Sequence, residues 1–239
     1  MAANKITDVG SAFFKFAREG FTYNLQVLPD VITASAALFA ILFQSPPLAT
    51  LGTAFLLMPW VHKGVAGFLG SVLPDMTTVS GDVDRCSGRF PGATYTSLLG
   101  FGGNAVSLIT TDKVPSYYSM FVGFLAGWIG VLPGLYAKEL AAAPEKARAS
   151  TGGLVILGIL CATVIVYRIL SNCESFFPVA IGLLSGFAVG VLAVMGVAWV
   201  SDRRATNVLS LPLIRSKTED GKPIYVCDRG EKTGNPNNQ

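Results

Sequence analysis

Long apolar segments dominate this sequence and limit what it can fold into. One of them runs from Val114 to Glu139, opening with the turn residues Pro115-Ser116 and closing at Tyr136 and Lys138. About 20 consecutive apolar residues are enough to cross the hydrocarbon core of a bilayer, and aromatic and basic residues mark membrane boundaries. The segment is therefore predicted to span a membrane.

The composition supports the same class for the whole chain. Of its 239 residues, 51% are hydrophobic and 14% are charged, which excludes an ordinary soluble domain. The 18 basic and 15 acidic residues nearly balance, and no basic block with interleaved aromatics occurs. The sequence therefore lacks the basic cluster that is typical of nucleic-acid binding.

Charge placement decides the number of spans, because residues 93–110 are uncharged but rich in Gly, Ser and Thr. If they cross, nearly all basic residues outside the spans fall on one side and almost only Lys113 falls on the other, as the positive-inside rule requires. We therefore expect both termini on the cytosolic side, with His62 at that boundary and on the face opposite Lys113. The predicted spans lie near 31–43, 48–61, 93–110, 115–136, 152–170 and 176–200.

The predicted fold class is an all-α polytopic membrane protein, a six-span helical bundle with an N-terminal amphipathic helix and a small C-terminal β-hairpin. Residues 1–28 are expected to lie in the headgroup plane, since phenylalanines oppose a basic polar face; a soluble helix packed on the bundle is the alternative. Residues 29–200 form the transmembrane domain. Residues 201–239 form a cytosolic tail with a hairpin turn at Asp220-Gly221.

Neither the polar loop at 74–91 nor the cysteines predict a metal or cofactor. Asp75, Asp82 and Asp84 stand in the loop, but Arg85 and Arg89 lie among them, so the charges are expected to be solvated or to face a partner. The cysteines show no spacing typical of metal ligation. All four are expected to be free thiols, with Cys161 buried: Cys86, Cys161, Cys173 and Cys227.

Glycines recur every fourth residue in two predicted spans. Gly123 and Gly127 lie in the fourth span, and Gly182, Gly186 and Gly190 lie in the sixth. Small residues let helix backbones approach closely in lipid. The pattern predicts helix packing within one monomer, and a dimer contact is the alternative.

Two polar segments precede apolar ones in the second half of the chain. Pro115-Ser116-Tyr117-Tyr118 leads into the fourth span, and Tyr167-Arg168 is followed by Glu174, Pro178 and the glycine-rich sixth span. Over residues 93–200 this layout resembles the lipid phosphate phosphatase superfamily. The second motif of that family is Pro-Ser-Gly-His, and its third is Ser-Arg, five residues, His, three residues and Asp.

The resemblance implies a phosphate site that has lost its catalytic groups. The family uses a histidine nucleophile and a second histidine as the acid, with lysine and arginines on the phosphoryl oxygens. Tyr118 and Glu174 stand at the two histidine positions, and the first motif is absent before Pro115. We therefore expect no enzyme and no catalytic residue, only a degenerate site of Lys113, Ser116, Tyr118, Arg168 and Glu174.

The whole chain, through PSYYSMFVGFLAGW, YRILSNCESFF and LPLIRSKTEDGKPIYVC, also resembles multi-span membrane proteins of nucleocytoplasmic large DNA viruses of algae and protists. This resemblance implies a structural protein of the virion inner membrane, derived from host endomembrane and linking the lipid bilayer to capsid or other virion membrane proteins. The alternative is a lipid-handling or carrier protein with an outer polar cavity around Lys113, Arg168 and Glu174. An active lipid phosphatase is the third interpretation.

Overall fold

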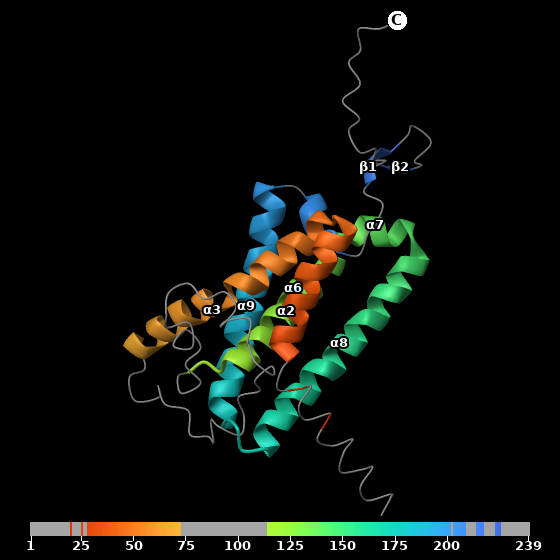
Figure 1. The fold of residues 1–239 in the computed structure, drawn as a ribbon. Coiled ribbons are helices and arrows are strands. Elements are labelled where there is room, and N and C mark those ends of the chain that lie inside the picture. The colour runs from red at the N-terminus through yellow and green to blue at the C-terminus, as the bar shows by residue number, and fades with distance from the viewer. Residues whose placement is uncertain are drawn as a thin grey trace, which may run out of the picture.

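The computed structural model describes residues 20, 25, 28–72, 114–201, 203–208, 214–217 and 223–225 (Figure 1). They form a helical structure with one short two-stranded ribbon. The helices are α2 (Leu28–Phe43), α3 (Pro46–Val72), α6 (Tyr117–Leu135), α7 (Ala137–Ala142), α8 (Pro144–Leu170), α9 (Phe176–Val200) and the 3-10 turn η3 (Arg203–Thr206). The strands are β1 (Ile214–Lys217) and β2 (Pro223–Tyr225), which pair antiparallel.

Four of these helices, α3, α6, α8 and α9, are long and apolar enough to cross a membrane, while α2 is shorter with 16 residues. An α-helical membrane protein is the fold class that this arrangement supports. Helices occupy the predicted spans near 31–43, 48–61, 115–136, 152–170 and 176–200. The predicted span at 93–110, the loop at 74–91 and the amphipathic segment before residue 20 lie outside the described residues.

Local sequence signals set the helix boundaries. Ser116 caps α6, because its hydroxyl oxygen accepts a hydrogen bond from the Ser119 backbone N–H at 3.3 Å. Pro144 stands at the first position of α8, where its missing N–H costs nothing. α2 and α3 are separated by a tight turn in which Gln44 has a positive φ of 47°.

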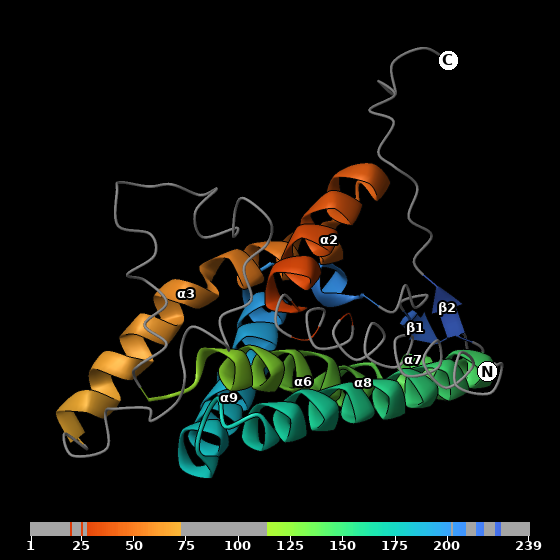
Figure 2. The ribbon, with the colours of Figure 1, turned by 60° about the horizontal axis from the view of Figure 1, so that its bottom comes forward.

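Helix α6 lies at the centre of the bundle and contacts α3, α8 and α9 (Figures 1 and 2). Aromatic side chains fill its contact with α3, where the Phe55 ring lies 4.9 Å from that of Phe121 and 5.8 Å from that of Phe124, measured between centroids. Trp128 and Leu132 are fully buried further along α6. By contrast, α8 buries mainly Cys161, Val164 and Arg168 and leaves most of its apolar surface exposed, as expected of a lipid-facing helix.

Glycines bring the parallel helices α6 and α9 into backbone contact. A Cβ added to Gly182 would lie 2.8 Å from the carbonyl oxygen of Ser116, and one added to Gly186 or Gly190 would collide with the carbonyls of Met120 and Phe124. The arrangement is reciprocal, because a Cβ on Gly123 or Gly127 would collide with the carbonyls of Leu183 and Phe187. All five glycines singled out from the sequence therefore lie at one helix contact within the monomer.

The two ends of the bundle can be named by the residues that meet there. At the Ser116 end, the Ser116 N–H donates to the carbonyl oxygen of Pro178 at 3.3 Å, so the starts of α6 and α9 are joined. At the α7 end, the Tyr136 hydroxyl lies 2.8 Å from Thr206 Oγ1, so α6 and η3 are joined. Strands β1 and β2 also lie at the α7 end (Figure 1).

Helix α2 begins at the Ser116 end. Leu25 and Leu28, at its start, pack with Val122 and Val164, close to the Ser116 end of α6 and α8. The last described helix, α9, ends at the α7 end (Figure 1). The described part of the chain therefore enters and leaves at opposite ends, so the prediction of both termini on one side requires a further crossing outside the described residues.

Candidate functional site

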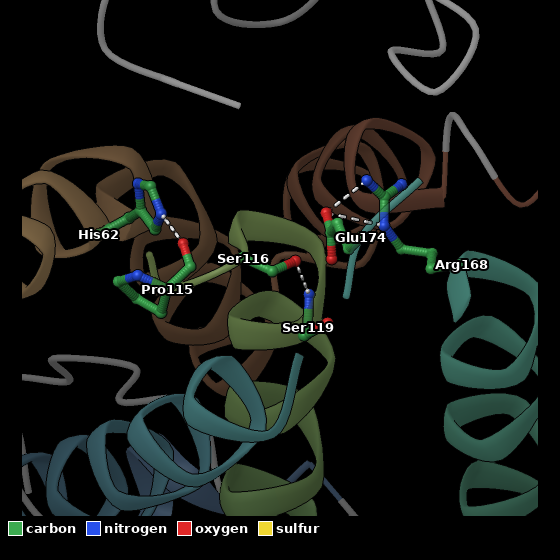
Figure 3. Close-up of polar contacts among 6 residues, drawn as sticks. All are labelled: His62, Pro115, Ser116, Ser119, Arg168 and Glu174. Atoms are coloured by element: carbon green, nitrogen blue, oxygen red, sulfur yellow. Dashed lines mark hydrogen bonds and ion pairs between the residues drawn. The ribbon is translucent and has the colours of Figure 1, made fainter. Parts of the chain in front are cut away.

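Four of the five predicted phosphate-site residues lie at the Ser116 end, on two segments that are about 50 residues apart in the sequence. Ser116 precedes α6, Tyr118 lies in its first turn, Arg168 lies in the last turn of α8 and Glu174 lies in the turn before α9. The fifth residue, Lys113, lies outside the described residues. Figure 3 shows Ser116, Arg168 and Glu174 near the start of α6.

Arg168 and Glu174 form a buried ion pair. Arg168 Nε donates to Glu174 Oε1 at 3.0 Å and Nη2 donates to the same oxygen at 2.5 Å, and the two side chains are only 4% and 6% exposed. Charges that are buried to this degree are tolerated only when they are paired and hydrogen-bonded. The cation that the sequence predicted for a phosphate is thus neutralised by the residue six positions along the chain.

Tyr118 covers the other face of this cation. The Arg168 guanidinium carbon lies 4.0 Å from the centroid of the Tyr118 ring, a cation–π contact. Tyr118, at one of the two positions where the resembled family has a histidine, therefore supplies an aromatic face to Arg168. This contact joins the first turn of α6 to the last turn of α8.

His62 corrects the predicted topology. The sequence placed it on the membrane face opposite Pro115, but His62 Nε2 lies 2.7 Å from the Pro115 carbonyl oxygen and its ring meets Tyr117 edge-on at 5.4 Å (Figure 3). A carbonyl oxygen only accepts, so Nε2 is the protonated nitrogen and donates. The prediction was wrong because α3 runs antiparallel to α6: Phe55 contacts Phe121 and Phe124, while His62, later in α3, reaches Pro115 at the start of α6.

Three buried polar atoms at the Ser116 end have no hydrogen-bond partner among the described residues. They are His62 Nδ1, Ser119 Oγ and Glu174 Oε2. Buried polar groups are normally hydrogen-bonded, so this end carries more hydrogen-bonding capacity than the described contacts use.

Cys173 corrects a second expectation. It was predicted to be a free thiol, but it is buried and disulfide-bonded, with its partner outside the described residues. Cys161 is free and buried, as predicted. The spacing of the cysteines gave no sign of the bond, since disulfide connectivity cannot be read from sequence alone.

A second polar cluster lies at the α7 end and was not predicted. The Tyr136 hydroxyl donates to the Arg203 carbonyl, and the Arg203 guanidinium donates to the Leu135 carbonyl. Glu139 is buried and lies 3.7 Å from Arg203 Nη1, measured from Oε1. These contacts fasten the segment after α9 to the end of α6. The sequence signal was slight: one glutamate beside Lys138 in an otherwise apolar region.

The described residues contain no group of three or more His, Cys, Asp or Glu side chains positioned to hold a metal ion. Comparison of the chain with protein-family models, with curated proteins and with solved structures found no match. Both family resemblances therefore stay predictions.

Proposed function

We propose that this chain is a non-enzymatic structural membrane protein. The observation that carries the proposal is the Arg168–Glu174 pair. A phosphate-handling site needs a cation that is free to meet the ligand, whereas Arg168 is buried, paired with a carboxylate and covered by Tyr118. A phosphate group would have to displace Glu174, so the arrangement favours a role in holding α6, α8 and α9 together.

The test is an activity measurement on the purified chain. We expect no release of phosphate from lipid phosphates such as phosphatidic acid, at any level above that of a Tyr118→Phe/Arg168→Met variant. Hydrolysis by the unaltered chain that Tyr118→Phe abolishes would overturn the proposal and establish the lipid phosphatase instead.

The second resemblance supports a finer placement of this structural protein, in the inner membrane of a large DNA virus. There the bundle of membrane-spanning helices would anchor it, with either residues 74–91 or residues 201–239, which follow helices that end on opposite sides, available to capsid or other virion membrane proteins. Crosslinking in intact particles should join one of these segments to a capsid component. Absence of the chain from purified particles would remove the virion placement and leave the non-enzymatic role untouched.

A lipid-handling or carrier function is the second candidate. It is favoured by the three buried polar atoms at the Ser116 end that lack partners among the described residues, since such groups in membrane proteins often serve a ligand or an ion. If it is correct, Arg168→Met should abolish lipid movement in reconstituted vesicles, whereas Lys63→Gln, an exposed site on α3, should not. Equal lipid movement in the unaltered chain, both variants and empty vesicles would exclude it.

A further inference from the structure

Exposed cations gather at the α7 end of the bundle. Lys138 lies on α7, Lys146 and Arg148 lie in the first turns of α8, and Arg203 and Arg204 lie in η3; all five are exposed. The described acidic residues at this end are Glu145, which is exposed, and Glu139, which is buried against Arg203. The described positive charge at this end therefore exceeds the negative charge by three, five cations against two carboxylates.

The Ser116 end has no such excess among the described residues. Arg168 and Glu174 neutralise each other there, Asp30 lies at the start of α2, and Lys63 is the remaining exposed cation. The described charge is thus strongly asymmetric along the bundle axis. A polar surface that contacts only water needs no excess of positive over negative charge.

Helix α8 sets the depth of the α7 end in a membrane. A helix of 27 residues is about 40 Å long, and the hydrocarbon core is about 30 Å thick, so roughly seven residues extend beyond it. The polar residues 144–150 match that length, and the apolar run begins shortly after them. Lys146 and Arg148 consequently lie at headgroup level when the apolar part of α8 is in hydrocarbon.

Two neighbouring features agree with this depth. Trp199, near the end of α9, is 88% exposed, which is typical of an aromatic residue at the membrane interface. Helix α7 crosses the end of the bundle between α6 and α8 (Figures 1 and 2). Lys138, on α7, therefore lies at the same end as the first turns of α8.

We propose that Lys138, Lys146 and Arg148 form a binding surface for anionic phospholipid headgroups. Arg203 contributes mainly to the α7 cluster, where it contacts Glu139 and the Leu135 carbonyl. The other three side chains extend from helix surfaces at headgroup level, where anionic lipids attract juxtamembrane cations. The proposal holds for any membrane in which the bundle resides and does not depend on the virion placement.

The test uses the full chain reconstituted into vesicles of equal parts phosphatidylcholine and phosphatidylserine. After mild detergent extraction, the ratio of the two lipids that remain bound is measured. We expect phosphatidylserine to be enriched several-fold, and Lys138→Gln/Lys146→Gln/Arg148→Gln to remove the enrichment. A cation near an anionic surface contributes about fivefold in affinity, so each single substitution should lower the enrichment by up to that factor.

Two matched variants separate this surface from a general charge effect. Lys63→Gln removes an exposed cation away from the α7 end and should leave the enrichment unchanged. Glu145→Gln removes the exposed acid within the surface and should raise it. An unchanged ratio in the triple variant, or no enrichment in the unaltered chain, overturns the proposal; the latter would leave an acidic protein segment as the partner of these cations. The thermal midpoints of all variants should match, since the substituted side chains are exposed.

Discussion

Arg168 and Glu174 show how one residue pair can favour a structural role over a chemical one. Both are nearly fully buried, and each is the charge partner of the other. Removing one partner of such a pair strands a buried charge, whereas replacing both with apolar residues is often tolerated. If the role of the pair is structural, replacing both residues should therefore restore stability, whereas replacing them in a ligand-binding site would also remove binding.

We predict that Glu174→Ala destabilises the protein by roughly 3 kcal/mol, because Arg168 is left buried without a counter-charge. Arg168→Met/Glu174→Leu should recover most of that loss. Thermal unfolding in detergent, followed by circular dichroism, measures both variants. If the double variant is no more stable than Glu174→Ala, the two residues do not act as an isolated ion pair.

The contacts of His62 lead to a second prediction about a single residue. Its Nε2–H is donated to the Pro115 carbonyl, and the side chain is fully buried. His62→Ala should cost roughly 2–3 kcal/mol, through the cavity and the unpaired carbonyl. Gln places an amide nitrogen near the position of Nε2, so His62→Gln should regain about 1 kcal/mol of this. Equal midpoints for the Ala and Gln variants would contradict the hydrogen bond.

At the scale of the elements, α6 and α9 are held together by backbone contact. Lipid tails are as apolar as leucine, so close van der Waals packing has to replace the hydrophobic drive between helices. We predict that Gly186→Ala costs more than about 2 kcal/mol, since its Cβ would collide with the Met120 carbonyl and neither backbone can move aside alone.

Gly196 lies on the same helix and is the matched control, because, apart from its chain neighbours and the backbone of its own helix, no atom of the described residues comes within 4 Å of the position that an added Cβ would take. Gly196→Ala should be neutral or stabilise by up to about 1 kcal/mol, because alanine favours the helix. Thermal midpoints in one detergent compare the two variants. Similar midpoints for both would mean that the α6–α9 contact is looser than the structure indicates.

Hydropathy and spacing predicted the elements well because these signals are local. Each described helix longer than ten residues coincides with a predicted span, and the glycine spacing marked the faces that meet. The contacts made by His62, Cys173 and Glu139 depend on which segments become neighbours, and no local pattern records that. The charge-based prediction failed at Lys63 because α3 packs antiparallel to α6, so the end of α3 lies beside the start of α6, and charge counting does not record how two spans pack.

At the scale of the whole molecule, the two polar clusters close opposite ends of one bundle. The cluster at the α7 end holds the segment after α9 through the Tyr136 hydroxyl, which contacts both the Arg203 carbonyl and Thr206. We predict that Tyr136→Phe lowers the free energy of unfolding of the bundle by no more than about 1.5 kcal/mol. Hydrogen exchange at residues 203–208 should rise about tenfold. Unchanged exchange there would show that η3 is held by packing alone.

The His62–Pro115 contact fixes the direction of α3 and thus the side on which it ends. If α3 passes Pro115 before its last turn, Ser71 lies on the same membrane side as Asn172 in the turn before α9, and Lys138 lies on the other. The charge pattern predicted instead that the end of α3 lies on the same side as Lys138.

Single cysteines at these three positions, in a chain whose own cysteines are replaced by serine, distinguish the two topologies. A membrane-impermeant maleimide applied to sealed vesicles should label Ser71→Cys and Asn172→Cys alike, and Lys138→Cys only after permeabilisation. If the chain inserts in the opposite orientation, Lys138→Cys should be labelled at once and the other two only after permeabilisation. Labelling of Ser71→Cys together with Lys138→Cys would restore the charge-based topology and rule out the contact that orients α3.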